Sequence, residues 1–361
     1  MNNELYIGVM SGTSLDGVDV VLCEINSVTC KLVASLEYPF EKDLKEEIFS
    51  ILVGNTTLHQ VGEIDVKLGL LFAKAVNELV RQNSINLLHV KAIGLHGQTL
   101  WHAPNSNYPF SMQLGNANVL SAKTGIQVVS DFRNMDIANG GQGAPFAPAF
   151  HRFFFGNIGL HVGVLNIGGM ANITLFDEQL LGWDVGCGNV LLDMWNLHVK
   201  GTGYDKDGAF AKSGKVHKAL LESFLADEYF KKEPPKSTGR EYFHRAWLDG
   251  HLASFSDLKA EDVQRTLLEL VVQSVANDIR NRGIQQLIVC GGGAKNIFLM
   301  QRLKEVCKID VTISDAFGIS ADFVEAMGFA WLAYMRVHNR AVHLKDVTGA
   351  SKNSLLGGIY G

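Results

Sequence analysis

The sequence predicts an α/β protein of two lobes, and three observations support this prediction. The chain has 361 residues, more than one hydrophobic core usually accommodates. Predicted helices alternate with predicted strands, as in layered α/β folds. A unit of strand, glycine-rich turn and returning strand begins near residue 5 and again near residue 162, which suggests an internal repeat. We assign residues 1–135 to an N-terminal lobe and residues 136–361 to a C-terminal lobe.

Composition excludes several classes of protein. A net charge of -5 provides no positive field for nucleic acid or anionic lipid. No apolar run reaches the roughly 18 residues of a membrane span, and the N-terminus lacks the basic region of a signal peptide. The five cysteines form no C-x-x-C pair. We therefore expect a cytoplasmic protein without a nucleic-acid or membrane partner.

The N-terminal lobe is predicted from alternating apolar patterns. Its expected elements are a strand over 5–10, a turn over 11–17, a strand over 18–25, a helix over 61–83, a strand over 90–95, a helix over 115–124 and a strand over 127–130. The segment 131–148 is rich in Gly, Pro, Asn and Asp, so we expect a long structured loop there. Loops of that length inside a compact domain are usually functional.

The C-terminal lobe opens with the second strand–turn–strand unit. Its expected elements are strands over 162–167, 173–176 and 180–183, helices over 189–197 and 216–230, a helix over 267–282, a strand over 286–290, and helices over 296–306 and 323–338. Residues 345–361 read as irregular surface sequence. The alternation again predicts an α/β lobe.

Three glycine-rich turns are candidates for phosphate binding, because the P-loop, the protein-kinase glycine loop and the dinucleotide fingerprint are absent. A tight polar turn remains the alternative for the first of them, but three such turns between strands favour one shared ligand. We predict ATP held between the lobes, its phosphates on the first two turns and its adenosine end capped by the third. The candidates are Gly12, Thr13, Ser14, Leu15, Asp16, Gly17, Val18 and Asp19, then Gly168, Gly169 and Asn189, and then Gly291, Gly292 and Gly293.

Asp184 is the candidate general base. It follows the strand-like segment 180–183 and precedes the glycine turn Gly186–Asn189. A base needs this placement, at a strand end where a ligand can approach closely. The alternative is a helix N-cap or turn aspartate.

Four polar residues near strand ends could bind a small-molecule substrate. Arg133 could contact a carboxylate in bidentate fashion, although it could instead pair with Asp131 on the surface. His96 and Gln98 suit hydroxyl groups, with a structural histidine as the alternative. His96 and His102 have no third ligand at a suitable spacing, so we expect no zinc site. Any Mg²⁺ would be bound mainly by ATP phosphates and one or two carboxylates.

Ordered motifs along nearly the whole chain resemble those of the anhydro-N-acetylmuramic acid kinases, within the superfamily that joins sugar kinases, actin and chaperone ATPases. The matching segments are 8–19, His96–Thr99, Asp131–Arg133, Gly141–Pro145, Asn166–Asn172, Pro234–Glu241, Glu325–Ala326 and Thr348–Ala350. The fold implied is the duplicated, ribonuclease H-like fold of actin-like ATPases. The implied reaction uses ATP and water to open the 1,6-anhydro ring and phosphorylate O6, giving N-acetylmuramate 6-phosphate and ADP in cell-wall recycling.

The resemblance also implies roles for residues. Asp184 matches the catalytic base, the segment from Gly12 to Asp19 matches the ATP phosphate loop, and Asp131, Arg133 and Glu325 lie among positions that line the sugar site. Members of the family are typically homodimers whose lobes close. An ordinary sugar or carboxylate kinase of the same superfamily, or a nucleotide-switched actin-like or chaperone-like ATPase, remains an alternative.

One segment departs from the family pattern. Where the family usually reads Asp-Thr-Gly-Pro-Gly-Asn, this chain reads Asp184-Val185-Gly186-Cys187-Gly188-Asn189. The base is retained, while a hydroxyl and a rigid proline are replaced. The chain therefore lacks the threonine hydroxyl and any contact that it makes in other members.

Overall fold

The computed structural model describes residues 3–12, 15, 17–53, 56–176, 180–234, 236–240, 242–255 and 257–361. Of the residues singled out above, Thr13, Ser14, Asp16, Pro235 and Glu241 lie outside the described residues. The chain forms two compact units, each described by itself below. Unit 1 comprises Met1–Phe155 and Phe323–Gly361, and unit 2 comprises Gly156–Asp322.

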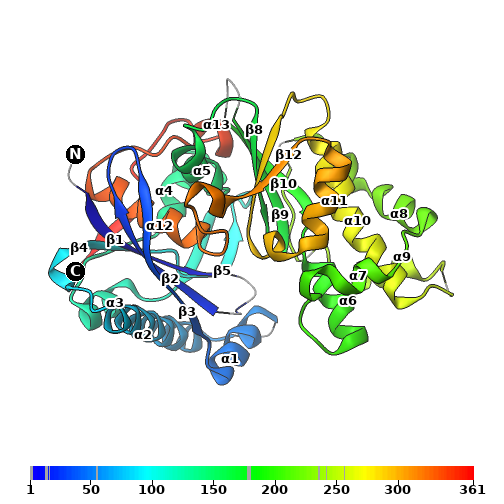
Figure 1. The fold of residues 1–361 in the computed structure, drawn as a ribbon. Helices are drawn as coiled ribbons and strands as arrows, with labels where there is room; N and C mark the ends of the chain where they lie inside the picture. Colours follow the sequence, from blue (N-terminus) through cyan, green and yellow to red (C-terminus); the bar gives the residue numbers. More distant parts are fainter. Residues whose placement is uncertain are drawn as a thin grey trace. The chain divides into compact units, whose positions relative to one another are not determined.

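Unit 1 contains a six-stranded sheet of order β13-β7-β4-β1-β2-β3 (Figure 1). Its strands are β1 (Glu4–Ser11), β2 (Gly17–Ile25), β3 (Cys30–Pro39), β4 (Val90–Leu95), β7 (Val128–Ser130) and β13 (Gly358–Tyr360); β5 (Gln98–Ala103) and β6 (Phe110–Leu114) form a separate hairpin. Its helices are α1 (Lys42–Val53), α2 (Leu58–Gln82), α3 (Ala117–Thr124), α4 (Phe132–Ala138), α5 (Ala147–Phe155), α12 (Val324–Val337) and α13 (Lys345–Thr348).

Helix α12 packs closely against β1 and β4 because two glycines leave room for its backbone. A β-carbon on Gly8 would lie 1.9 Å from the carbonyl oxygen of Ala326, and one on Gly94 would lie 1.9 Å from that of Phe329. No side chain fits at such a distance. On α2, apolar residues at helical spacing, including Leu68, Phe72 and Leu79, are fully buried. These contacts fix the sheet between helices on both faces.

Unit 2 contains a five-stranded sheet of order β10-β9-β8-β11-β12. Its strands are β8 (Val162–Ile167), β9 (Met170–Phe176), β10 (Leu180–Cys187), β11 (Gln286–Cys290) and β12 (Asp310–Ile313). Its helices are α6 (Val190–Lys200), α7 (Ala209–Ser213), α8 (Lys218–Leu225), α9 (Arg245–Leu252), α10 (Ala260–Ile279) and α11 (Ile297–Cys307). Among its short 3₁₀ helices are η3 (Glu228–Lys231) and η4 (Gly292–Lys295).

The two sheets share one topology. In unit 1, β1, β2 and β3 are antiparallel, and β4 and then β7 continue the sheet in parallel to β1. In unit 2, β8, β9 and β10 are antiparallel, and β11 and then β12 continue it in parallel to β8. The duplicated α/β fold expected from the sequence is therefore confirmed. The position of a nucleotide between the lobes stays a prediction.

Several expectations about elements and domain bounds differ from the structure. The loop expected over 131–148 contains α4 and the start of α5, because Phe132 and Ile137 are buried and hold a short helix against the core. The tail over 345–361 is not irregular throughout, since it forms α13 and the edge strand β13, which pairs with β7. The division expected between residues 135 and 136 does not coincide with the observed units, because 323–361 returns to unit 1.

Candidate active site

Polar side chains meet at the carboxyl ends of β1 and β4 in unit 1. The Ser11 hydroxyl donates a 2.5 Å hydrogen bond to Gln98 Oε1, and both residues are buried. The backbone N–H of His96 donates to the carbonyl of Val9 at 3.0 Å, which fixes the residue directly after β4. Carboxyl ends of parallel strands are the usual binding edge of an α/β sheet. The predicted residues His96 and Gln98 thus lie at such an edge.

Arg133, in the first turn of α4, is held by three contacts. Its Nη1 donates to the Gly143 carbonyl at 2.8 Å, its Nη2 lies 2.9 Å from His96 Nε2, and its guanidinium lies 5.1 Å from the centre of the Phe146 ring. Since arginine only donates, His96 Nε2 must accept, which places the proton of the neutral ring on Nδ1. Buried Nδ1 of His96 and Nε of Arg133 have no hydrogen-bond partner within the described part of the chain.

Burial and mutual charge set the ionisation of this cluster. Burial, assisted by the charge of Arg133, lowers the pKa of His96 to about 3, so the ring is neutral near pH 7. Burial lowers the pKa of Arg133 to about 10, an effect that the nearby Glu325 opposes. Glu325 lies in the first turn of α12, where the surrounding protein raises its pKa and the charge of Arg133 opposes the rise. Arg133 is therefore a cation with one nearby carboxyl group.

Asp131 does not pair with Arg133, contrary to the surface-pair alternative. It stands before α4 in the left-handed region, with a φ of 60°, and its side chain is exposed. Its Oδ1 accepts from Asn134 Nδ2 at 2.7 Å. Asn134 also binds the backbone N–H and carbonyl of Ser111 on β6, so Asp131 lies next to the β5–β6 hairpin.

Asp136 organises the loop after α4, and nothing in the sequence pattern singled it out. Its Oδ2 accepts from the backbone N–H of Gly143 at 2.8 Å, and its Oδ1 accepts from the Thr348 hydroxyl at 2.9 Å. A β-carbon on Gly141 would lie 2.2 Å from Asp136 Oδ2, so only glycine fits there. Gly143 supplies the carbonyl that binds Arg133. The buried carboxylate thus connects the C-terminal segment to the position of Arg133.

The described residues of the first glycine turn include two whose apolar side chains are buried in the core. Leu15 and Val18 are fully buried in the core of unit 1. The Leu15 N–H donates to the Gly12 carbonyl at 3.2 Å, and Asp19 lies opposite Met10 in the β1–β2 pairing. Predicted contacts of Leu15 and Val18 with a ligand could therefore involve only their backbone groups.

The second glycine turn, Gly168–Gly169, adjoins the start of α6. The N–H groups of Gly188 and Val190 donate to the Gly169 carbonyl at 2.9 and 3.1 Å, and that of Asn189 donates to the Gly168 carbonyl at 2.8 Å. A β-carbon on Gly188 would lie 2.4 Å from the Gly168 oxygen, so glycine is required for this approach. The second glycine turn therefore lies against the start of α6, at the positive end of that helix dipole.

The third glycine cluster adjoins the second. The Asn189 side chain donates to the Ile167 carbonyl at 3.3 Å and does not cap α6. A β-carbon on Gly291 would lie 2.3 Å from Asn166 Oδ1, and one on Gly292 would lie 3.9 Å from Asn189 Nδ2. Gly293 is buried, where a β-carbon would lie 2.4 Å from Ile167 Cγ2. The predicted residues of the second and third turns are therefore neighbours.

Asp184 lies within β10, next to an irregularity in its pairing with β9 between Asp184 and Gly186. It is neither a helix N-cap nor a turn residue, so that alternative is wrong, as is the end of the strand expected at residue 183. Its Oδ2 accepts from the Thr238 N–H at 3.0 Å, its N–H donates to the Lys236 carbonyl at 3.0 Å, and its carbonyl accepts from the Tyr229 hydroxyl at 2.7 Å. The carboxylate is thus held by a segment more than fifty positions further along the chain.

The two residues after Asp184 that depart from the family pattern, Val185 and Cys187, have buried side chains. Val185 is 1% exposed and Cys187 is 2% exposed. Burial raises the pKa of the Cys187 thiol to about 12, so the thiol stays neutral. A residue at position 185 therefore offers no group to a ligand at the strand edge.

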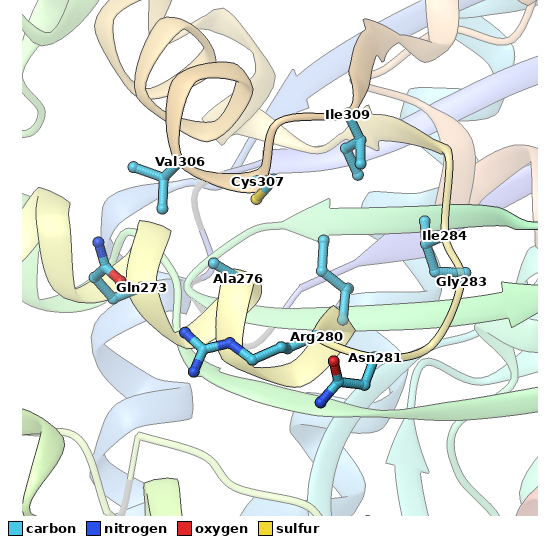
Figure 2. Close-up of a pocket in the computed structure, with 10 residues that line it drawn as sticks. Gln273, Ala276, Arg280, Asn281, Gly283, Ile284, Val306, Cys307 and Ile309 are labelled. Atoms are coloured by element: carbon cyan, nitrogen blue, oxygen red, sulfur yellow. The ribbon is translucent and has the colours of Figure 1, made fainter.

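A pocket of about 280 Å³ in unit 2 lies away from these residues. Figure 2 shows its lining, which includes Arg280, Asn281 and Cys307. Gly283 and Ile284, which also line it, precede β11, whereas Gly291–Gly293 follow that strand. The pocket therefore adjoins the opposite end of β11. Within the described ranges, no group of three or more His, Cys, Asp and Glu side chains could hold a metal ion, and no helix is long and apolar enough to cross a membrane.

Comparison with known proteins adds relatives over the full length. Anhydro-N-acetylmuramic acid kinase from Sulfurovum sp. (strain NBC37-1) is 57% identical over 100% of both chains. That from Sulfurimonas denitrificans is 54% identical over 99% of this chain and 100% of its own. Among solved structures, a glucokinase from Streptomyces griseus is 14% identical with a TM-score of 0.42, covering 91% of this chain and 98% of its own.

A family model described as anhydro-N-acetylmuramic acid kinase matches residues 4–361. That range includes both sheets, the three glycine turns and Asp184. Full-length relatives at more than half identity agree with it. The chain belongs to the anhydro-N-acetylmuramic acid kinase family.

Proposed function

We propose that this enzyme uses ATP and water to open the 1,6-anhydro ring of anhydro-N-acetylmuramic acid and to phosphorylate O6. Its products are N-acetylmuramate 6-phosphate and ADP. The observation that carries the proposal is the Asp184 carboxylate, fixed by the Thr238 N–H on a strand that leads directly into the glycine-rich start of α6. A general base beside an anion-binding turn suits activation of water next to a phosphoryl acceptor.

Backbone groups are proposed to bind the ATP phosphates. Gly168 and Gly169 present a turn at the start of α6, and the segment from Gly12 to Asp19 is assigned to the same phosphates from unit 1. Asn189 is grouped with the second turn, and the cluster Gly291, Gly292 and Gly293 is assigned to the adenosine end. Mg²⁺ would come with the nucleotide, bound mainly by its phosphates, and would neutralise their charge.

Side chains of unit 1 are proposed to bind the sugar. Arg133 stays cationic and presents a planar guanidinium to the lactyl carboxylate of the substrate. The Nδ1 proton of His96 and the amide of Gln98 are available to sugar oxygens. Asp131 and Glu325 are assigned to hydroxyl groups at the edge of the same site. This concentration of polar side chains is what recognition of a carboxylated sugar requires.

The proposed reaction makes two bonds and breaks two at the sugar and phosphate. Asp184 takes a proton from water while the water oxygen attacks the anomeric carbon. The bond from that carbon to O6 breaks, and O6 forms a bond to the γ-phosphorus as ADP leaves. Phosphoryl transfer depends mainly on positioning and charge stabilisation, which the glycine turns supply.

Oxygen labelling tests this proposal directly. The purified enzyme is incubated with ATP, anhydro-N-acetylmuramic acid and ¹⁸O-water, and the product is analysed by mass spectrometry. The expected product carries one ¹⁸O at C1 and phosphate at O6. An unlabelled phosphorylated sugar would indicate an ordinary sugar kinase, and ATP hydrolysis without sugar turnover would favour a nucleotide-switched ATPase.

The cellular location, the metabolic role and the oligomeric state are also proposed from the family. We place the enzyme in the cytoplasm, in recycling of cell-wall sugars, as a homodimer. Light scattering coupled to size-exclusion chromatography checks the dimer, which has twice the 39.5 kDa chain mass. A single-chain mass at micromolar concentration would contradict it.

A further inference from the structure

The segment Lys236–Arg240, called the strap below, joins the proposed base to the second glycine turn. We propose that Arg240, carried by the strap, is the cation that binds the phosphate chain of the nucleoside triphosphate. This inference rests on the proposed ATP-dependent activity and adds to it a residue that none of the glycine turns contains.

The first end of the strap is anchored in the interior of unit 2. Lys236 Nζ lies 2.9 Å from Asp278 Oδ1 on α10, and its side chain is only 2% exposed. Asp278 Oδ2 accepts a 2.7 Å hydrogen bond from Trp183 Nε1, next to Asp184. A buried ion pair with satisfied partners holds its elements in one geometry. Lys236 is thus a positioning residue for the strap.

The second end is anchored by an aromatic cluster. The Gly239 carbonyl accepts the N–H groups of Tyr242 and Phe243, each at 3.1 Å. Phe243 is fully buried, with its ring centre 5.5 Å from that of Tyr229 and 5.3 Å from that of Trp247. Both ends of the five-residue strap are therefore fixed before any ligand binds.

Two residues of the strap, Thr238 and Arg240, contact the proposed site. The Thr238 N–H donates to Asp184 Oδ2 at 3.0 Å, and the buried Thr238 hydroxyl has no partner in the described part of the chain. Arg240 lies against Gly169, since a β-carbon built there would be 3.5 Å from Nη2 and 3.8 Å from Nε. One segment thus contacts both the Asp184 carboxylate and the second glycine turn.

The state of Arg240 distinguishes it from structural arginines. Its side chain is exposed and makes no hydrogen bond or ion pair with the described residues, whereas Arg245 nearby pairs with Asp249 at 2.7 Å. An unpaired guanidinium beside a glycine turn and a helix N-terminus adds full charge to a site that already favours anions. Charge that develops on a transferring phosphoryl group is stabilised most by such preorganised donors.

The test compares Arg240→Ala with Arg240→Lys and with the matched surface variant Arg245→Ala. Binding of ADP, AMP and adenosine is measured by calorimetry, and the KM values for ATP and the sugar come from coupled ADP release. For Arg240→Ala we expect affinity for ADP to fall about 10- to 100-fold and kcat to fall about 100-fold, with adenosine affinity and the sugar KM unchanged. Arg240→Lys should recover part of the loss, and Arg245→Ala should behave like the wild type.

Equal losses for ADP and adenosine, or an Arg240→Ala enzyme equal to Arg245→Ala, would overturn the inference. Thermal denaturation of each variant identifies a general loss of fold. Because nucleotide binding is measured without sugar, the role of Arg240 is separable from the proposed reaction. A wild-type protein that binds ADP through Arg240 but leaves the anhydro sugar unchanged would refute the reaction alone.

Discussion

The two units have the same strand order but differ at the carboxyl ends of their strands. In unit 1, that end carries buried polar side chains, where Arg133 contacts His96 and the Ser11 hydroxyl donates to Gln98. In unit 2, the corresponding end is built mainly from backbone around Gly168. A β-carbon would not fit at the neighbouring Gly188 or Gly291. The strands, which form the core, keep their pairing, while the strand ends have diverged.

This difference suits two kinds of ligand. A sugar is recognised by a few precisely placed polar side chains, whereas a phosphate chain needs N–H groups and close approach of the backbone. Asp184 stands apart in unit 2 as a carboxylate at an otherwise glycine-rich edge. Mutations can therefore separate sugar recognition, phosphate binding and chemistry.

The largest effect is expected for Asp184→Asn. The amide keeps an oxygen for the Thr238 N–H but cannot take a proton, so kcat should fall by about 10²- to 10⁴-fold with ADP affinity retained. Steady-state ADP release and calorimetry measure the two quantities, with surface Asp249→Asn as the control. A near-normal kcat would remove Asp184 from the role of base.

A smaller and more selective effect is expected for Arg133→Ala. Loss of a charged donor should raise the sugar KM by roughly 10- to 100-fold while the ATP KM changes little, if unit 1 recognises the carboxylate. The exposed Arg152→Ala, on α5 of the same unit, is the control. Parallel rises in both KM values would show that the division of labour between the units is wrong.

Two buried histidines of unit 1 should also make the stability of the protein depend on pH. Burial lowers the pKa of both His96 and His151 to about 3, from an ordinary value of 6.5. Between pH 6.5 and pH 3 the unfolded chain therefore binds more protons than the folded chain. The contribution of the two histidines to the free energy of unfolding is fully present above pH 6.5 and is lost as pH falls toward 3. Each histidine adds up to about 1.4 kcal/mol per pH unit to the slope.

Urea unfolding at pH 7.5, 6.0 and 5.0 measures that slope. His151→Phe keeps a ring at the site, which lies edge-on to Phe150, but removes the titration. Its unfolding free energy should fall less between pH 6.0 and 5.0 than that of the wild type, while exposed His89→Gln should leave the slope unchanged. Identical slopes for all three proteins would show that His151 does not couple folding to pH.

The smallest effect is expected for a substitution of Val185, which follows Asp184 in unit 2. Val185 and Cys187 are buried, so their side chains face the core. Val185→Thr should leave kcat within about two-fold, and its cost should appear as a loss of stability of roughly 1–3 kcal/mol from burying a hydroxyl. Coupled ADP release and urea unfolding separate these outcomes. A several-fold change in kcat at unchanged stability would mean that position 185 acts on the reaction.

Strands and long helices were predictable because their apolar patterns are local. The helix expected over 61–83 corresponds to α2, and the strand expected over 286–290 is β11. The tail was missed because β13 has only three residues, and its pairing with β7 depends on a contact distant in sequence. Asp136, in a segment rich in polar residues, gave no signal that its carboxylate is buried beneath Thr348.

The same physical reason decides which parts of the candidate site could be inferred from the sequence. The glycine turns follow strands, so their placement could be inferred from the chain order, whereas the strand that precedes Asp184 in the expectation continues through it as β10. The strap could not, because Thr238 reaches Asp184 across 54 positions and Arg240 follows two prolines in a segment without periodicity.

The return of 323–361 to unit 1 has a consequence for the order in which the protein can fold during synthesis. Unit 2 is one continuous stretch, so it can fold as soon as residue 322 has left the ribosome. Unit 1 begins first but must wait, because α12 covers β1 and β4 and β13 closes the edge of β7. The half of the chain made first is therefore the half completed last, and its sheet spends most of translation with a face and an edge uncovered.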